Sequence, residues 1–286
     1  MSEITTLPTV DFFGRRVSRL ILGDNPFNGH SYIPDFATGI EMNDFYTEDK
    51  IIETLFNAEK AGINTILPLA CSKMFGVFPR YFETGGKMQI IFQPYPAESV
   101  EENFKKMLEW KPIAIYHQGT TTDYLTETDQ TDIIKKNIAV FKSAGIPIGL
   151  GTHVPETIIK AEEENWGIDF YMASLYNARI NRRGEQSGFI TGKTKADLFF
   201  YPDDRFLMYE IIKKVNKPFI AFKIFAGGQI FTGKPEREYE ATAENMLREV
   251  YANIKPNDIA AVGVFQRDKN LIAQNAALVK KILSSN

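Results

Sequence analysis

Short apolar segments with few interior charges alternate along the chain with longer segments of helical period. The apolar segments lie at 17–25, 64–70, 88–95, 113–120, 147–154, 169–177, 218–228 and 258–266. This alternation is typical of parallel strands that are covered on the outside by helices. The pattern therefore predicts an α/β protein, a single (β/α)8 TIM barrel with a short N-terminal hairpin before the first strand.

A doubly wound open sheet is the alternative fold. No GxGxxG follows the first strand, where a dinucleotide-binding crossover carries its glycines, and this favours the barrel. The helix between the second and third strands is expected to be weak, because Pro79 and the Gly85-Gly86 pair interrupt it. No linker rich in Pro, Gly or Ser divides the chain, so we expect one domain over residues 1–286.

The longest irregular segment is a loop at 177–204, after the sixth strand. A loop of this length in a compact domain is usually functional or partly mobile. It carries four cationic side chains, which either close over an anionic or polyhydroxylated ligand or are solvated: Arg182, Arg183, Lys193 and Lys195.

The composition excludes several classes of partner. Hydrophobic residues at 44% and a formal net charge of −3, with lysines scattered over the predicted helices, give a globular protein without a basic surface for nucleic acid. No basic segment followed by an apolar run opens the chain and no segment approaches the length of a membrane span, so we expect no membrane partner and a cytoplasmic location. Because Cys71 is the only cysteine, an intramolecular disulfide and a multi-thiolate zinc site are excluded.

Short motifs follow one another in a fixed order along the chain. They are FGRRVSRLILGDN at 13–25, AEKAGINTI at 58–66, IYHQ at 115–118, DFYMASLYN at 169–177, KIFAGGQIF at 223–231 and VGVFQRDKNLIAQNAALV at 262–279. In their order and spacing they resemble the aldo/keto reductases, and the resemblance runs the length of the chain. It implies the TIM-barrel fold more strongly than it implies a reaction.

The resemblance also implies four reacting groups: a tyrosine proton donor, a lysine that lowers its pKa, an aspartate that holds the lysine, and a histidine that orients the carbonyl. In this sequence Leu67 corresponds to the aspartate, and Ser72 or Phe75 corresponds to the tyrosine. Gln93 corresponds to the lysine, and only His117 is in place. General acid catalysis needs a titratable donor near the carbonyl oxygen, so the usual hydride-transfer mechanism is not expected here.

Cofactor binding is a separate question. The resemblance implies an aromatic residue that stacks on nicotinamide and a loop after the last strand that grips phosphate. The candidates are Tyr171 or Tyr176 for stacking, and Arg267, Lys269 and Asn275 for the phosphate end. On this basis NADP is a candidate cofactor.

Polar side chains gather at the carboxyl ends of the predicted strands, where TIM barrels build their active sites. They are Asp24, Asn25, His30, Gln93, His117, Gln118, His153, Tyr176, Asn177, Lys223, Gln266 and Arg267. All three histidines of the chain belong to this set. Histidine titrates near neutral pH and serves as an acid, a base or a metal ligand, although any one of them could be a structural, hydrogen-bonded residue. Their clustering favours a functional site.

Lys223 lies within an otherwise apolar segment, where a charged amine is costly to bury without a partner. It could hold an anion, polarise a carbonyl or form a Schiff base. The alternative is a structural ion pair with Asp24.

A divalent metal is less expected. His117, His153 and Asp24 could form a first coordination shell, but no HxH or HExxH motif is present. Cys71, after the second strand, could act as a nucleophile or be a small apolar filler.

The leading hypothesis is an enzyme that acts on a small polar, carbohydrate-like substrate by acid/base chemistry. Its catalytic residues would be His117, His153 and Lys223, with Asp24 beside them. Substrate-binding residues would be Asn25, His30, Gln93, Gln118, Tyr176, Asn177 and Gln266. The alternatives are an NADP-dependent oxidoreductase with a rearranged catalytic set, and a non-catalytic ligand-binding barrel.

Overall fold

Eight parallel strands close into a barrel in the computed structural model, which describes residues 6–33, 35–177 and 199–284. The barrel strands are β3 (Leu20–Gly23), β4 (Thr65–Leu67), β5 (Gln89–Phe92), β6 (Ala114–His117), β7 (Ile148–Thr152), β8 (Phe170–Ser174), β9 (Phe219–Phe222) and β10 (Ile259–Val262). Each pairs with the next in sequence, and β10 returns to β3. The predicted TIM barrel is confirmed, and the open sheet is excluded.

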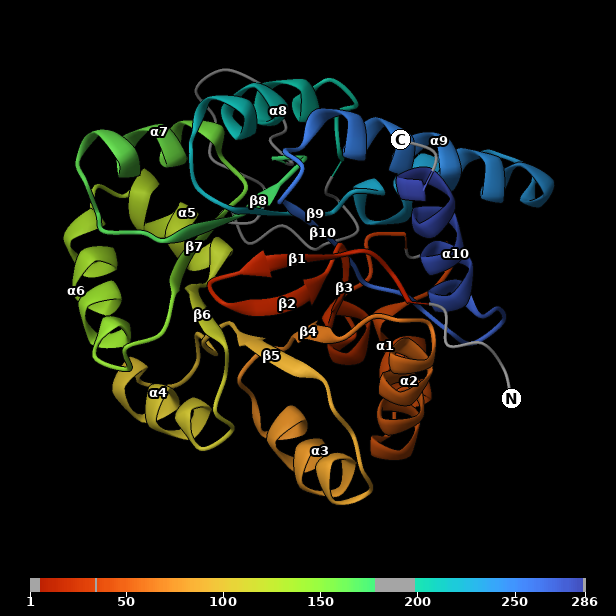
Figure 1. Cartoon of the computed structure of the whole chain (residues 1–286), viewed down its shortest axis with the longest axis horizontal. Helices are drawn as coiled ribbons and strands as arrows, with labels where there is room; N and C mark the ends of the chain where they lie inside the picture. Colours follow the sequence, from red (N-terminus) through yellow and green to blue (C-terminus); the bar gives the residue numbers. More distant parts are fainter. Residues whose placement is uncertain (1–5, 34, 178–198, 285–286) are drawn as a thin grey trace.

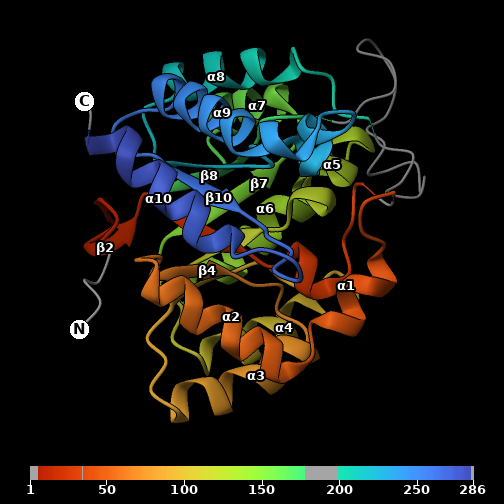
Figure 2. The same ribbon diagram turned by 90° about the vertical axis from the view of Figure 1, so that its right-hand side faces the viewer.

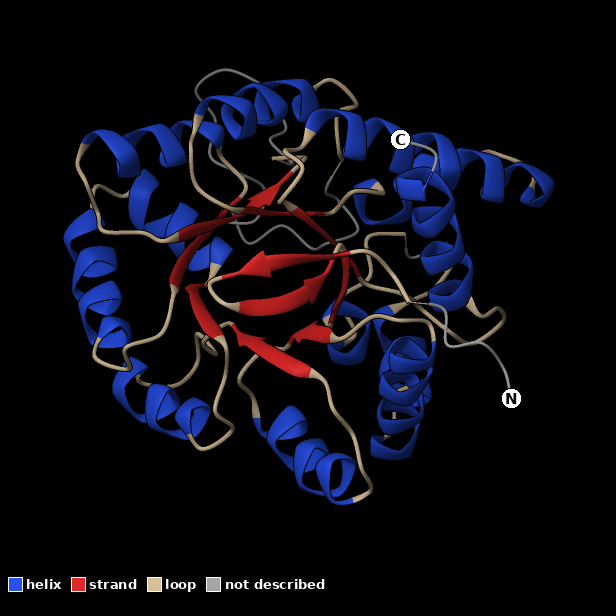
Figure 3. Cartoon of the chain, viewed as in Figure 1, coloured by secondary structure: helices blue, strands red, loops and turns tan. Residues whose placement is uncertain are grey.

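Helices surround the barrel and cover its outer face (Figures 1 and 3). The α-helices are α1 (Gly39–Phe45), α2 (Glu48–Lys60), α3 (Ser72–Glu83), α4 (Val100–Leu108), α5 (Gly119–Glu127), α6 (Thr131–Lys142), α7 (Pro155–Glu163), α8 (Asp204–Lys214), α9 (Tyr239–Asn253) and α10 (Leu271–Ser284). Short 3-10 helices η1 (Asn25–Asn28), η3 (Ala226–Phe231) and η4 (Glu236–Glu238) lie in the connections. Among the described residues, no helix is both long and apolar enough to cross a membrane.

The predicted amino-terminal hairpin is also present. Strands β1 (Thr9–Phe12) and β2 (Arg15–Ser18) pair antiparallel and lie across the centre of the barrel in Figure 1. Turned by 90°, the same molecule shows β2 at one end and α1 at the other (Figure 2). Val10, Phe12 and Val17 are buried with side chains of the barrel interior. The hairpin therefore closes one end and leaves the other for a site.

Side chains alternate between two apolar clusters along each strand. In β3, for example, Ile21 packs with the hairpin inside the barrel, whereas Leu20 and Leu22 pack with the helices outside. This period of two follows from strand geometry. It decides which strand-end residues face the barrel mouth and which face the helix layer.

The helix between β4 and β5 is stronger than expected. It runs unbroken as α3 over twelve residues, with Pro79 inside it. Met74, Val77, Phe78 and Tyr81 form a buried face, and tertiary packing of such a face supplies most helix stability. The weak-helix prediction was wrong because it weighed the proline above the apolar stripe.

Candidate functional site at the barrel mouth

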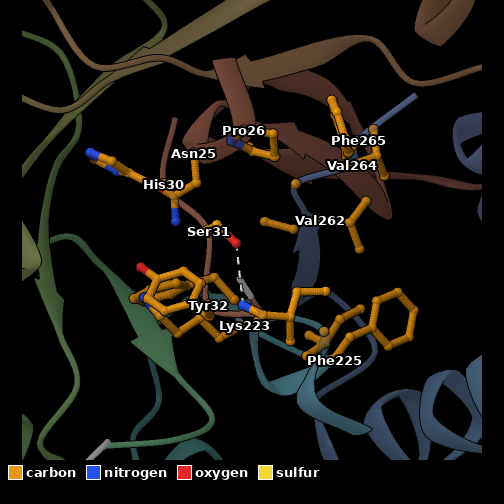
Figure 4. A pocket seen from close by; sticks show the side chains of 18 of the residues that line it. Asn25, Pro26, His30, Ser31, Tyr32, Lys223, Phe225, Val262, Val264 and Phe265 are labelled. Carbon is orange, nitrogen blue, oxygen red and sulfur yellow. Dashed lines mark hydrogen bonds between the residues drawn. The ribbon is translucent and has the colours of Figure 1, made fainter. Parts of the chain in front are cut away.

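The carboxyl ends of the strands border a cavity of about 1410 Å³. Figure 4 shows part of its wall, where residues after β3 lie opposite residues after β9 and around the end of β10. Of the residues predicted from the sequence, the cavity is lined by Asp24, Asn25, His30, Gln93, Gln118, His153, Lys223, Lys269 and Asn275. Described residues predicted for the site that do not line it are Cys71, His117, Tyr171, Tyr176, Asn177, Gln266 and Arg267. Arg182, Arg183, Lys193 and Lys195 lie outside the described residues.

A hydrogen-bonded chain of three side chains stands at this cavity. His153 follows β7, and its Nδ1 lies 2.7 Å from Oδ2 of the buried Asp123. Its Nε2 lies 3.0 Å from Nζ of Lys223. A carboxylate only accepts, so Nδ1 carries the proton, and Nε2 presents its lone pair toward the lysine. Burial and the lysine charge both lower the pKa of His153, and Asp123 opposes them, so the ring is held as a neutral base.

The backbone of Lys223 is unusual. Strand β9 ends at Phe222, and Lys223 follows with a φ of +54°, in the left-handed region that non-glycine residues seldom occupy. Its Nζ lies 5.1 Å from the ring centroid of Tyr32 and 4.9 Å from that of Phe222. Figure 4 shows Lys223 beside Tyr32. The ion pair between Lys223 and Asp24, expected as an alternative, does not occur among the described residues.

Asp123 is the functional candidate that the sequence interpretation missed. It lies on α5, is fully buried, and accepts hydrogen bonds from the Thr152 hydroxyl at 2.5 Å and from the His153 backbone at 3.2 Å. The available signal was a carboxylate on the inner face of a short helix that otherwise buries only Gly119, Thr122 and Leu125. A buried carboxylate needs such donors, so its presence indicates a built polar cluster.

Asp24 supplies a second titratable group on the cavity wall. It is 2% exposed, and its Oδ2 accepts from the Leu69 backbone at 2.6 Å and from Nδ2 of Asn28 at 2.8 Å. Burial raises its pKa to about 6, and these hydrogen bonds only partly oppose the rise. The carboxyl group therefore exchanges its proton just below neutral pH, a range useful for acid/base chemistry.

His117 lies away from the cavity. It follows Ile115 on the helix side of β6, and its Nδ1 is 2.8 Å from the Thr122 hydroxyl while its Nε2 is 3.2 Å from Nδ2 of Asn137. Since the Thr122 hydroxyl donates to a backbone carbonyl, it accepts from Nδ1, and Asn137 donates to Nε2. Burial lowers the pKa of His117 to about 4. The ring is therefore a neutral bridge between β6, α5 and α6, placed for a structural role.

The residues predicted to bind substrate divide into two sets. Asn25, His30, Gln93 and Gln118 line the cavity, with Nδ1 of His30 3.4 Å from Oδ1 of Asn25. Gln118 also caps α5, because its Oε1 accepts from the Thr121 backbone at 2.7 Å.

The second set stands behind the wall of the cavity. Tyr176 is buried with its hydroxyl 3.9 Å from Sδ of Met246, the backbone N–H of Asn177 donates to Asp204, and Oε1 of Gln266 accepts from the Ile272 backbone. These contacts join the elements that surround the cavity, and none of the three residues lines it.

The predicted phosphate-gripping residues have acidic neighbours. Arg267 contacts Asp268 and Glu41, and Lys269 forms an ion pair with Glu236. Asn275 is buried on α10 and lines the cavity. An incoming phosphate would have to compete with these carboxylates for both cations.

Metal and thiol chemistry find little support in the described part of the chain. It contains no group of three His, Cys, Asp or Glu side chains placed to hold a metal ion. Burial raises the pKa of Cys71, which leaves its thiol protonated at neutral pH and favours the packing role.

Comparison with known proteins finds similar folds among solved structures. No protein-family model and no curated protein matches this sequence. Among solved structures, the chain is similar to Gox0644 in its apo form, with 12% identity over 97% of this chain and 94% of that chain and a TM-score of 0.59. A mutant of Gox0644 in complex with NADPH gives a TM-score of 0.58 at the same identity and coverage. A truncated 3-deoxy-D-arabino-heptulosonate 7-phosphate synthase from Thermotoga maritima gives 0.53, at 11% identity over 98% of this chain and 91% of that chain.

Fold and site together define the class of this protein: it is a TIM barrel with a cavity at the carboxyl ends of its strands, lined by apolar side chains and by several polar and charged ones. At these identities the similarities show the fold alone and do not support membership of the aldo/keto reductases.

Proposed function

We propose that this protein is an enzyme that acts on a small polar, carbohydrate-like molecule by acid/base chemistry at the barrel mouth. His153 is the proton-transfer group, Lys223 the electrophilic stabiliser and Asp123 the positioning residue. The proposal depends on one observation, the chain of contacts from Asp123 through His153 to Lys223 at the cavity. A base that a third group, here a carboxylate, holds in orientation is a recurrent catalytic arrangement.

His153 would accept a proton from the substrate at Nε2, in place of the hydrogen bond that this nitrogen accepts from Lys223. The buried Asp123 fixes the tautomer and stabilises the imidazolium that results. The ammonium of Lys223 would stabilise negative charge on a substrate oxygen, as positive groups at developing oxyanions do. Because His117 bonds at both ring nitrogens and does not line the cavity, it is left out of this proposal.

Asp24 would be the complementary acid. Its pKa of about 6 leaves a useful protonated fraction near neutral pH, while burial and Lys223 push the pKa of His153 downward. Groups whose environments assign them different protonation states are a common basis for acid and base roles. Asn25, His30, Gln93 and Gln118 provide donors and acceptors suited to several hydroxyl groups.

The test is to incubate the protein with a library of sugars, sugar acids and sugar phosphates and to follow conversion by mass spectrometry. Replacing His153 by Asn is expected to lower turnover about 10² to 10⁴-fold, the usual contribution of a general base. The control is Asp132→Asn, at a side chain that is 98% exposed. Equal turnover by His153→Asn and the control would exclude the proposed role. Binding without conversion would favour the non-catalytic ligand-binding barrel.

An NADP-dependent oxidoreductase is the second candidate. Lys269 and Asn275 line the same cavity, and one structure of similar fold, that of Gox0644, is a complex with NADPH. In this case Lys223 would replace the missing tyrosine as donor. Titration with NADPH, followed by protein fluorescence, checks it, and absence of binding at roughly millimolar cofactor would exclude it.

A further inference from the structure

We propose that Lys223 is a covalent nucleophile, which forms an imine with the carbonyl carbon of an aldehyde or ketone substrate. This inference rests on the proposed function, because it assigns a carbonyl group to the substrate of the same cavity. In this mechanism Lys223 does not stabilise the substrate through its charge alone, but becomes part of a covalent imine that accepts electrons from the substrate.

The geometry around Lys223 is that of an activated nucleophile. Its Nζ lies 3.0 Å from Nε2 of His153, and the opposite ring nitrogen lies 2.7 Å from Asp123. A nucleophile within hydrogen-bond reach of a base that a third group orients is the arrangement shared by Ser, Cys and Lys nucleophiles. A lysine that served only as a cation would not need a base held at its nitrogen.

The backbone places Lys223 where strand geometry alone would not. Ala221 packs on the helix side of β9 and Phe222 lines the cavity, so strict alternation would send Lys223 toward the helices. The φ of +54° reverses that direction and brings the side chain into the cavity. Backbone strain of this kind is unfavourable and persists where the surroundings hold it in place.

The turn that follows Lys223 packs against neighbouring side chains and can hold its backbone in this conformation. A Cβ on Gly227 would lie 2.8 Å from atoms of Tyr32, so this turn and Tyr32 are packed against each other. The Tyr32 ring centroid lies 5.1 Å and that of Phe222 lies 4.9 Å from Nζ. Aromatic faces stabilise a cation, and the iminium formed on this nitrogen is a cation as the ammonium is. The walls therefore suit both reactant and product.

The step balances within these groups. The Lys223 ammonium gives a proton to Nε2 of His153, and the neutral amine forms a C–N bond with the carbonyl carbon. The protonated His153 returns its proton to the carbonyl oxygen to give a carbinolamine. A second proton from the nitrogen, passed through His153, lets that oxygen leave as water when the C–O bond breaks. The net reaction converts one ammonium and one carbonyl into one iminium and one water.

The experiment uses the whole chain with small carbonyl probes and needs no known substrate. Glyceraldehyde, dihydroxyacetone and pyruvate are each incubated with the protein and sodium cyanoborohydride, which reduces an imine to a stable amine. Acetylacetone is a fourth probe, because it forms a stable enaminone with neutral lysine amines. Peptide mass spectrometry then gives the labelling rate of each lysine, with the exposed Lys214 on α8 as the internal reference.

We expect Lys223 to be labelled at least about tenfold faster than Lys214, because general-base assistance is worth that much or more. His153→Asn should remove this advantage, and Lys214→Arg should leave it unchanged. Labelling of Lys223 no faster than that of Lys214 with all four probes would overturn the imine proposal.

A second measurement separates this inference from the proposed function. Lys223→Arg keeps the positive charge but cannot form an imine. If it still converts a library substrate that His153→Asn does not, the imine is refuted and acid/base catalysis stands. If Lys223 is labelled rapidly but no library compound is converted, the imine is supported and the carbohydrate assignment fails.

Discussion

Asp24 is placed so that its ionised form works against folding. Its carboxyl group is 2% exposed, and burial raises the pKa to about 6 in the folded protein. In the unfolded chain an aspartate ionises near its ordinary value of about 3.9. Between these two values the folded state holds a proton that the unfolded state has released. Stability is therefore full below about pH 4 and falls as the pH rises through about 6.

The size of the effect follows from the difference between the two pKa values. Each unit corresponds to about 1.4 kcal/mol, so the ionised Asp24 lowers the free energy of unfolding by about 3 kcal/mol at neutral pH. Asparagine has nearly the same shape, and its amide oxygen can accept from the Leu69 backbone and from Asn28 as the carboxyl oxygen does. Asp24→Asn should therefore be more stable than wild type by up to about 3 kcal/mol at pH 7.5 and nearly equal to it at pH 4.

Urea denaturation at intervals between pH 4 and pH 8 measures this difference directly. Asp132→Asn, on an exposed helix position, is the matched control: it keeps Asp24, so its difference in stability from wild type should not change in this way with pH. A gap between Asp24→Asn and wild type that stays constant with pH would refute the reasoning. So would a variant that is less stable at pH 7.5, because either result means that the folded state does not penalise the charge.

Two other buried groups give further predictions. His117 has a pKa of about 4 in the folded protein and about 6.5 in the unfolded chain, so only the unfolded chain binds a proton between these values, and acidification from pH 6.5 to 4 lowers the free energy of unfolding by about 3 kcal/mol. His117→Gln should remove this part of the pH dependence in urea denaturation. If the free energy of unfolding falls as steeply with acid in the variant, the ring is not held neutral. Asp123→Ala should lower the free energy of unfolding by about 3–5 kcal/mol, since it leaves the buried backbone and ring N–H groups of His153 without their acceptor, whereas Asp132→Ala should stay within about 0.5 kcal/mol of wild type. In Asp123→Asn the carboxylate no longer raises the pKa of His153, so the acid limb of the pH–activity profile should move to lower pH; a limb that does not move would show that Asp123 does not act through His153.

The sequence was sufficient for the barrel. Eight apolar segments at regular intervals determine parallel strands, and the carboxyl ends of such strands meet at one end of the barrel, so the sequence alone predicts that Asp24, His153 and Lys223 lie together. They do line one cavity. The same period of two also separates His117 from His153: His117 shares the helix side of β6 with Ile115, whereas His153 follows Gly151 toward the barrel mouth.

Tertiary structure decided the rest. Asp123 meets His153 only because α5 packs against β7, and contact between residues thirty positions apart has no local signature. Lys223 faces the cavity because its backbone turns into the left-handed region after β9, against the direction that alternation prescribes. Local periodicity specifies elements and the faces of those elements. The pairing of a carboxylate, an imidazole and an amine depends on how a helix and two strands pack and on one strained dihedral, which the folded chain as a whole determines.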